Sequence, residues 1–392
     1  MAVQPIPIYL DHNATAPAHP AAVTAWLEAT RGLWHNPSSL TPDASRAREA
    51  IERARETLGD VLDCDPGRIV FTSGATESAN AIARHLAASP PTQENPSLAL
   101  VSPIEHSSVA DAFSAELGCR LRSIEVDANG IVSPECVAMT IDHAFADGST
   151  VGIVSVMAAS NESGVLEPWQ AIARICRERR VPFHTDATQW LGRLPARGLG
   201  ECDWVSASGH KCGGPRGVGF IVVPEGLRFQ AAFGGPQEHG RRAGTEDTAG
   251  ILALVAAIVA REEETASTRE VRASFRDAAE RRLLDRLPAA MIVSGSAQRL
   301  WNTLALVLPG QDGRRIVSRL AAAGVAASTG SACSAGAGST PAILSAIGHD
   351  RLGLAAKDLR GMVRLSAGWE TTAEDWIAAI DILVKVAGGD VS

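Results

Sequence analysis

Short β-rich runs alternate with segments of helical periodicity over residues 43–256, and this alternation limits the folds open to the chain. In the segment 43–58, alanine, isoleucine and leucine recur at steps of three and four residues, which predicts a helix. The β-rich runs predicted as strands are 68–72, 98–102, 150–157, 182–186, 204–208 and 218–222. Strands joined through helices run parallel and are covered by helices on both faces. The sequence therefore predicts a large α/β domain over residues 15–256.

The last third of the chain has a different order of elements. Residues 251–287 are predicted to form one long helix, or two with a break near 265–268. The elements predicted after it are a strand at 301–308, a helix at 311–323, a strand at 360–366 and a helix at 373–386. We therefore expect a smaller α+β domain over residues 257–392, with the N-terminal segment 1–14 packed on it.

Composition argues against several classes of protein. With 36 basic and 44 acidic residues the net charge is −8, which argues against a general nucleic-acid binder. The longest apolar run, 250–260, is about half of the roughly 20 residues that cross a bilayer, and the first residues do not resemble a secretory signal. The seven cysteines are widely spaced, which argues against a disulfide scaffold and a thiolate zinc site. We expect a cytoplasmic protein without a membrane span or a metal site.

Lysine is rare in this sequence, and one lysine occupies an unusual position. The three lysines are Lys211, Lys357 and Lys385, and Lys211 follows a predicted strand within the small-residue segment 206–219. A lysine among small residues can reach a carbonyl ligand and form a Schiff base, helped by a pKa that desolvation lowers. The alternative is an ordinary surface lysine in a turn.

Two further strand ends carry groups that suit a phosphorylated cofactor. Asp186 ends the predicted strand 182–186, where open parallel sheets bind ligands and where a carboxylate could keep a pyridinium nitrogen protonated. The alternative for Asp186 is a helix N-cap. The turn 73–76 follows a strand and opens a helix, so its N–H groups could bind a phosphate, although many α/β proteins have such a turn.

A segment of small residues near the C-terminus, 328–339, contains a single thiol, that of Cys333. A cysteine on an exposed loop can be a nucleophile, whereas a structural cysteine is usually buried among apolar side chains. The alternative is a glycine- and serine-rich loop without a chemical function.

These segments belong to a longer series of motifs that occur in the order typical of one family. The motifs are YLDHNAT at 9–15, NPSS at 36–39, FTSGATE at 71–77, EH at 105–106, NE at 161–162, DATQ at 186–189, SGHK at 208–211, RAGT at 242–245 and GSAC at 330–333. On these motifs, the sequence resembles the cysteine desulfurases of the class V aminotransferase group over nearly its whole length. The resemblance implies an enzyme of fold type I with a seven-stranded sheet that depends on pyridoxal 5'-phosphate. The long cysteine loop resembles the group that supplies sulfur for iron–sulfur clusters and tRNA thiolation.

The resemblance also implies catalytic roles. Lys211 is expected to bind the cofactor covalently and to move protons at the substrate Cα. Cys333 is expected to attack the sulfur of L-cysteine and to carry it as a persulfide, which leaves alanine as the product. His106 is expected to stack on the cofactor ring and to act in acid–base steps.

The remaining implied residues bind the cofactor, the substrate or a partner. The cofactor would be held by Ala75, Thr76, Ser208 and His210 at the phosphate, Asp186 at the pyridine nitrogen, Gln189 at the ring oxygen, and Asn161. Arg364 is expected to bind the substrate carboxylate bidentately, with support from Asn36 and Asn161. Thr245 is expected to reach the phosphate of a partner subunit, which implies a homodimer. A sulfur-acceptor protein would take the persulfide sulfur.

Four positions depart from the usual pattern of the family, namely Pro42, Ala158, Ser160 and Trp369. They leave the partner surface and the fine substrate preference open. The alternatives to a cysteine desulfurase are a selenocysteine lyase or other pyridoxal-dependent C–S lyase, an ordinary transaminase, and a non-catalytic sulfur-transfer partner protein.

Overall fold

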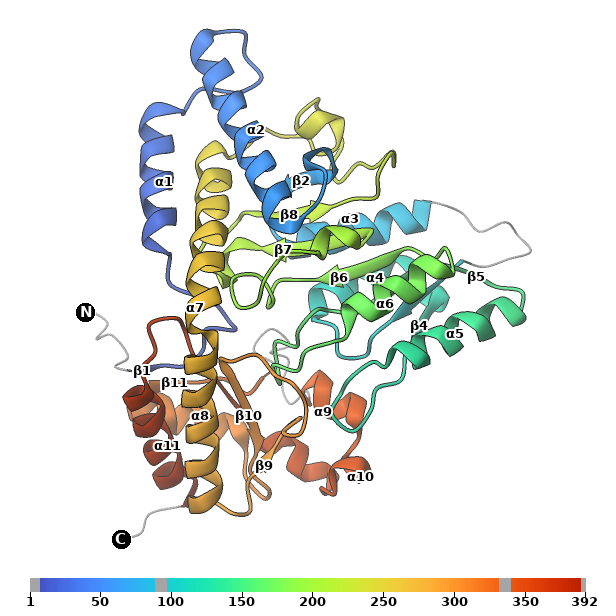
Figure 1. Cartoon of the computed structure of the whole chain (residues 1–392). Helices are drawn as coiled ribbons and strands as arrows, with labels where there is room; N and C mark the ends of the chain where they lie inside the picture. Colours follow the sequence, from blue (N-terminus) through green and yellow to red (C-terminus); the bar gives the residue numbers. More distant parts are fainter. Residues whose placement is uncertain (1–7, 89–96, 331–339, 389–392) are drawn as a thin grey trace.

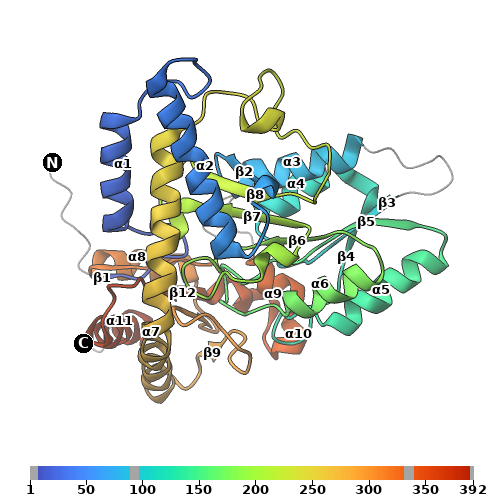
Figure 2. The ribbon, with the colours of Figure 1, turned by 45° about the horizontal axis from the view of Figure 1, so that its top comes forward.

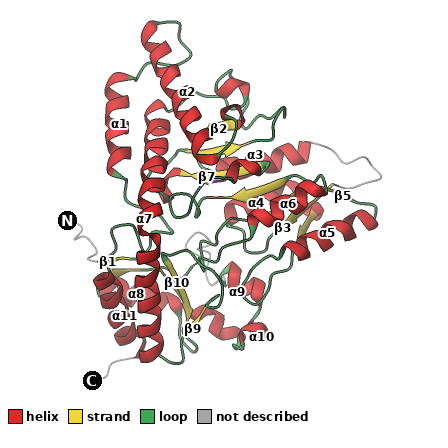
Figure 3. Cartoon of the chain, in the orientation of Figure 1, coloured by secondary structure: helices red, strands yellow, loops and turns green. Residues whose placement is uncertain are grey.

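The computed structural model describes residues 8–88, 97–330 and 340–388. A large α/β part and a smaller α+β part lie side by side, and the long helix α7 (Thr248–Arg286) runs along both (Figure 1). Figure 3 shows the strands of the large part enclosed by helices. Among the described helices, none combines the length and the apolar character that a membrane span requires.

The large part is built on the seven-stranded sheet that the resemblance implied. In spatial order its strands are β2 (Ile69–Thr72), β8 (Gly219–Val222), β7 (Trp204–Ser208), β6 (Phe183–Asp186), β5 (Thr150–Ser155), β3 (Ser97–Val101) and β4 (Leu121–Ser123). β8 is antiparallel to both of its neighbours, and every other neighbouring pair is parallel. The strands β2, β6 and β8 are buried at every residue, as expected for strands covered on both faces.

Helices cover both faces of this sheet (Figure 2). The helices α3 (Ala75–Ala88) and α4 (Ser107–Leu117) share one apolar cluster with side chains from one face. The helices α2 (Pro42–Leu62), α5 (Pro134–Ala146) and α6 (Trp169–Glu178) join the core of the other face. Pro42 is the first residue of α2, a position that proline favours, and Thr41 caps the helix. The departure at Pro42 therefore has a structural explanation.

The smaller part combines two short sheets with helices. Its antiparallel sheet consists of β9 (Met291–Ile292), β10 (Thr303–Val307) and β12 (Met362–Ser366), and a parallel pair consists of β1 (Ile8–Tyr9) and β11 (Val325–Ala326). Its helices are α8 (Gly313–Ala322), α9 (Ala342–Ile347), α10 (His349–Leu352) and α11 (Ala373–Gly388). The remaining helix, α1 (Pro20–Gly32), packs along α7 (Figure 1).

The structure confirms the α/β class, the mostly parallel sheet and the single-helix alternative, because α7 continues through 265–268 without a break. The division into domains at residues 256 and 257 falls inside α7 and stays a prediction. The sequence analysis missed β4, β9 and β11, which have two or three residues each and therefore show no periodicity.

Candidate active site

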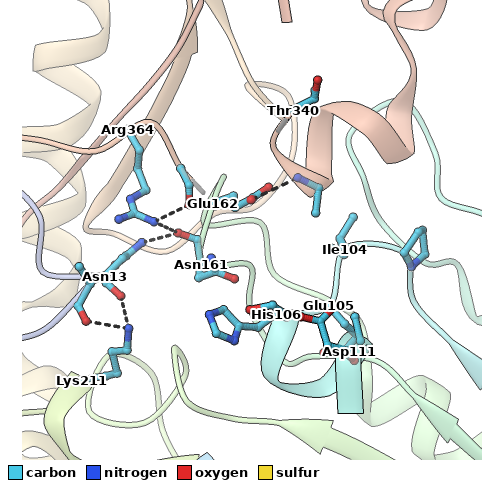
Figure 4. Close-up of a pocket in the computed structure, with 16 residues that line it drawn as sticks. Asn13, Ile104, Glu105, His106, Asp111, Asn161, Glu162, Lys211, Thr340 and Arg364 are labelled. Carbon is cyan, nitrogen blue, oxygen red and sulfur yellow. Dashed lines mark hydrogen bonds between the residues drawn. The ribbon is translucent and has the colours of Figure 1, made fainter. Parts of the chain in front are cut away.

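Two cavities lie at the carboxyl ends of the parallel strands, the edge where open sheets of this kind bind ligands. The first, of about 210 Å³, lies against the turns that follow β2, β6 and β7, and we call it the turn cavity. The second, of about 230 Å³, lies where both parts and the N-terminal segment meet, and we call it the junction cavity (Figure 4). Ala14, His106, Asn161 and Lys211 line both cavities.

Lys211 lies at the boundary of the two cavities. It ends the single helical turn η4 (Gly209–Lys211), which follows β7. Its Nζ donates hydrogen bonds to the carbonyl oxygens of Asn13, at 2.6 Å, and Ala14, at 2.8 Å (Figure 4). The carbonyl of Lys211 accepts a hydrogen bond of 3.3 Å from the fully buried Arg193. The amino group of Lys211 is therefore held within reach of ligands in either cavity.

The turn before α3 offers a site for an anion at one end of the turn cavity. The Ala75 N–H donates to Ser208 Oγ at 2.9 Å, which joins the first turn of α3 to the end of β7. Gly74 has a φ of 147°, a conformation that favours glycine. Ala75, Thr76, Ser208 and His210 all line this end, where the helix dipole and the hydroxyl groups favour a phosphate.

His210 contributes to this end as a neutral group. One of its ring nitrogens, Nδ1, lies 3.1 Å from Thr15 Oγ1. Burial, together with the neighbouring charge of Lys211, lowers the pKa of His210 to about 4. At neutral pH the imidazole therefore offers hydrogen bonds without a charge.

The middle of the turn cavity is polar and buried. Asp186 is 5% exposed, and its Oδ1 accepts the Thr188 N–H at 2.8 Å. The buried side-chain oxygens of Thr188 and Gln189 make no hydrogen bond within the described residues. Unpaired buried polar atoms are costly, so this surface suits a polar ring such as a pyridine that carries a hydroxyl group. The residues present therefore fit pyridoxal phosphate.

His106 stands at the start of α4, and its ring points toward the side of the cavity where Lys211 lies (Figure 4). Its Nδ1 accepts the Ser108 N–H at 3.1 Å and lies 2.8 Å from Ser108 Oγ. In the neutral ring the proton is then on Nε2, the nitrogen that does not cap the helix.

Arg364, on β12, provides the positive charge of the junction cavity and is 2% exposed. Its Nη1 donates to the carbonyl oxygens of Asn161, at 2.8 Å, and Gly330, at 3.2 Å, and its Nη2 lies 2.6 Å from Asp11 Oδ1. Its Nε is buried and has no partner within the described residues. A buried guanidinium that already pairs with one carboxylate can recognise the carboxylate of a ligand.

The structure adds residues to which the sequence analysis gave no role. The Asn13 side chain donates to Thr303 Oγ1 at 3.0 Å and to the Asn161 carbonyl at 3.1 Å, which fixes the carbonyl that accepts from Lys211. Glu162 lines the junction cavity and accepts the Ile343 N–H at 2.8 Å. Both lie inside motifs that carry the resemblance, which was the available signal. Arg193 lies outside those motifs and had none.

Two predicted site residues lie outside the turn cavity and the junction cavity. Asn36 and Thr245 are exposed, in the α1–α2 loop and in the loop before α7, and neither lines the turn cavity or the junction cavity. These two loops approach each other, because Gln237 Nε2 lies 3.5 Å from Ser38 Oγ. Cys333 lies outside the described residues.

Two of the other departures from the family pattern, Trp369 and Ser160, have local structural roles. Trp369 is buried, donates from Nε1 to the Gly192 carbonyl at 3.1 Å, and has the Arg261 guanidinium 3.8 Å from its ring centroid. Ser160 Oγ accepts the N–H groups of Glu162 and Ser163, both at 3.2 Å, and so shapes the turn behind Asn161. None of the four departures lines the turn cavity or the junction cavity, although residues next to Ala158 and Ser160 in the sequence do.

A large mostly parallel sheet with a lysine after one strand and an aspartate at the end of the neighbouring strand defines the class, pyridoxal phosphate enzymes of fold type I. Comparison with known proteins agrees. The family model described as aminotransferase class-V matches residues 8–378. The cysteine desulfurase IscS of Dictyoglomus turgidum is 32% identical over 97% of this chain and 94% of its own length.

Solved structures show the same relationship. A NifS-like protein has a TM-score of 0.85 and 27% identity, over 97% of this chain and 99% of its own. SspA in complex with cysteine has a TM-score of 0.75 and 26% identity, over 92% of this chain and 98% of its own. The chain therefore belongs to the aminotransferase class-V family, among the cysteine desulfurases.

Proposed function

We propose that this protein is a pyridoxal phosphate-dependent cysteine desulfurase, which converts L-cysteine into L-alanine and transfers the sulfur to Cys333. The observation that carries the proposal is the position of Lys211. Its amino group lies between a turn cavity that suits the cofactor and a junction cavity whose Arg364 suits an amino-acid carboxylate. The family relationship supports the same activity, and it does not favour selenocysteine lyase or a non-catalytic partner protein.

Different residues of the chain have different roles around the reacting atoms. Bound pyridoxal phosphate supplies an electron sink for the electron pair left at the substrate Cα. Arg364 binds the substrate carboxylate and fixes the Cα proton in the direction of Lys211. Lys211 Nζ takes up that proton and later returns it, and the Asn13 and Ala14 carbonyls hold its protonated form. His106, with Nε2 toward the cavity, is placed to exchange a proton with the substrate thiol.

Sulfur transfer is assigned to Cys333. The Cys333 thiolate attacks the substrate sulfur, the new S–S bond forms as the substrate Cβ–S bond breaks, and the bonding electron pair stays with carbon. That carbon then gains a proton and leaves as the methyl group of alanine. The persulfide sulfur passes to an acceptor protein, with iron–sulfur assembly or thiolation as the proposed destination.

We propose further that two chains complete each other's sites in a homodimer. Asn36 and Thr245 support this, because both are exposed on neighbouring loops outside the turn cavity and the junction cavity. Trp34, Leu40 and Phe233, on or beside these loops, are between 71% and 98% exposed, which suits a face that a second copy covers. We place the protein in the cytoplasm, which fits the six described cysteines, all of which are free.

The experiment compares wild type with Cys333→Ser on L-cysteine, with alanine and protein-bound labelled sulfur measured in the same reaction. Wild type is expected to form both products, whereas Cys333→Ser is expected to keep the cofactor absorbance and to form neither persulfide nor alanine at the wild-type rate. The exposed Cys119→Ser variant is the matched control and should behave like wild type. Alanine release that persists in Cys333→Ser, or sulfur label on another cysteine, would overturn the assignment.

A further inference from the structure

A row of buried polar side chains crosses the large sheet beside the turn cavity. Ser155 on β5, His184 on β6 and Ser206 on β7 are fully buried, and Glu105, between β3 and α4, is 3% exposed. Ser155 Oγ lies 3.0 Å from Glu105 Oε1 and 2.8 Å from His184 Nδ1. His184 Nε2 lies 3.0 Å from Ser206 Oγ. We call these four residues the relay.

The hydrogen bond from Ser155 to Glu105 determines which atom donates in each of the other hydrogen bonds of the relay. Ser155 donates its one hydroxyl hydrogen to Glu105 Oε1, so His184 Nδ1 must donate to Ser155 Oγ. Burial lowers the pKa of His184 to about 3, so the ring is neutral and its Nε2 is an acceptor. Ser206 therefore donates to Nε2, and every bond of the relay points toward Glu105.

The relay adjoins the candidate active site at two points. Glu105 lines the junction cavity and directly precedes His106. His184 lies two residues before Asp186, so both side chains are on the same face of β6, and Asp186 pairs in register with Ser206. A change in the relay would therefore move His106 and Asp186, the two side chains that the family resemblance places at the cofactor ring.

Glu105 also has an unusual electrostatic setting. Its Oε2 is buried and makes no hydrogen bond of ordinary geometry within the described residues. Burial raises the pKa of Glu105 well above its ordinary value, and the charges of Asp186 and Glu167 raise it further, against the hydrogen bond from Ser155 and a contact with the Met157 backbone N–H. A protonated Glu105 still accepts the Ser155 hydroxyl through Oε1.

We propose that Glu105, acting through Ser155, His184 and Ser206, is a positioning residue that holds His106 and Asp186 against the cofactor ring. The inference rests on the proposed function for the identity of the cofactor. It does not depend on the substrate or on sulfur transfer, so it can be tested in the absence of L-cysteine. If wild type binds pyridoxal phosphate but releases no alanine, the proposed function fails and the relay is still tested.

The experiment measures the Kd for pyridoxal phosphate and the visible absorbance of the bound cofactor as a function of pH. Glu105→Ala is expected to weaken cofactor binding about tenfold and to shift the pH midpoint of the absorbance, while Glu105→Gln stays within about twofold of wild type. Glutamine keeps the oxygen that accepts from Ser155 and carries no charge, so it should replace a protonated Glu105. Ser155→Ala, which removes one small group from the relay, should change both readouts in the direction of Glu105→Ala.

Glu167→Ala is the matched control. Glu167 is also 3% exposed and also has one carboxylate oxygen without a partner in the described chain, but it caps Val132 and lines neither cavity. It should lower the melting temperature and leave the cofactor Kd and absorbance unchanged, because burial and Asp186 are the larger causes of the raised pKa of Glu105 and both stay in place. The proposal is overturned if Glu105→Ala and Ser155→Ala leave both cofactor readouts at the control values, or if Glu105→Gln is as impaired as Glu105→Ala.

Discussion

The turn cavity and the junction cavity share Lys211 but are built from different parts of the chain. The turn cavity is formed mainly by loops of one sheet, with Asp186 at the end of β6 and Ser208 at the end of β7, and Ala14 of the N-terminal segment also lines it. The junction cavity needs the large part, the N-terminal segment and the smaller part, which supplies Arg364 from β12. The binding of the cofactor in the turn cavity therefore depends mainly on one sheet, whereas the binding of the substrate in the junction cavity depends on the packing of separate parts of the chain. The comparison predicts that cofactor binding and substrate binding can be impaired separately.

The largest effect is expected for Lys211→Ala, because Lys211 belongs to both cavities. The variant should lose the visible absorbance of a lysine-bound cofactor and about a thousandfold in kcat, the middle of the range for acid–base groups. The controls are Lys357→Ala and Lys385→Ala, both on exposed side chains, which should match wild type. Absorbance that persists in Lys211→Ala and can be fixed to the protein by borohydride would show that another group binds the cofactor.

A smaller effect concerns the stability of the sheet that carries the turn cavity. The pKa of His184 is about 3 in the folded chain because of burial, against 6.5 when exposed. The unfolded chain takes up this proton below pH 6.5 and the folded chain does not, so acid favours unfolding. Between pH 7 and pH 5, His184 should lower the free energy of unfolding by about 2 kcal/mol.

Urea unfolding of the cofactor-free protein at the two pH values measures this effect. The His184→Gln variant is less stable at neutral pH, but its stability should fall less on acidification than that of wild type. Equal pH dependence in the two proteins would show that His184 is not held neutral by the sheet.

The smallest effect is expected for Ser208→Ala, which acts on the turn cavity alone. The variant loses the oxygen that accepts the Ala75 N–H at 2.9 Å, beside the site for the phosphate. The Kd for pyridoxal phosphate should rise about fivefold, as for one ordinary hydrogen bond, with an unchanged KM for L-cysteine. Dialysis equilibrium measures the Kd, and the exposed Ser123→Ala on β4 provides the control. A rise in the KM for L-cysteine without a change in the Kd for pyridoxal phosphate would show that Ser208 acts in substrate binding and not in cofactor binding.

The turn cavity was also the more predictable of the two from sequence. Asp186 ends one strand and Lys211 follows the next, both strands have a clear β-rich pattern, and parallel strands bring their carboxyl ends to one edge. The phosphate turn was visible as small residues between a strand and a helix. The family resemblance was needed only to predict that this turn binds a phosphate, because such turns are common in α/β proteins.

The junction cavity could not be built from local patterns. The approach of Arg364 to Asp11 joins residues far apart in the chain, and the capping of Ile343 by Glu162 does the same. Arg193, which donates hydrogen bonds to the carbonyl oxygens of Gln189 and Lys211, belongs to no motif. Short elements such as β9 and β11 were missed because two residues carry no period. Asn36, Thr245 and Cys333 remain predictions.

The central claim is that the two cavities divide cofactor and substrate binding around one lysine, and a cross-comparison of Asp186→Asn with Arg364→Lys tests it most directly. For each variant, the absorbance and Kd of the bound cofactor are measured beside kcat and KM for L-cysteine. Asp186→Asn should change the cofactor absorbance and lower kcat about a hundredfold at unchanged KM, while Arg364→Lys should raise KM about tenfold at unchanged cofactor Kd. The same loss in both sets of readouts for both variants would contradict the division.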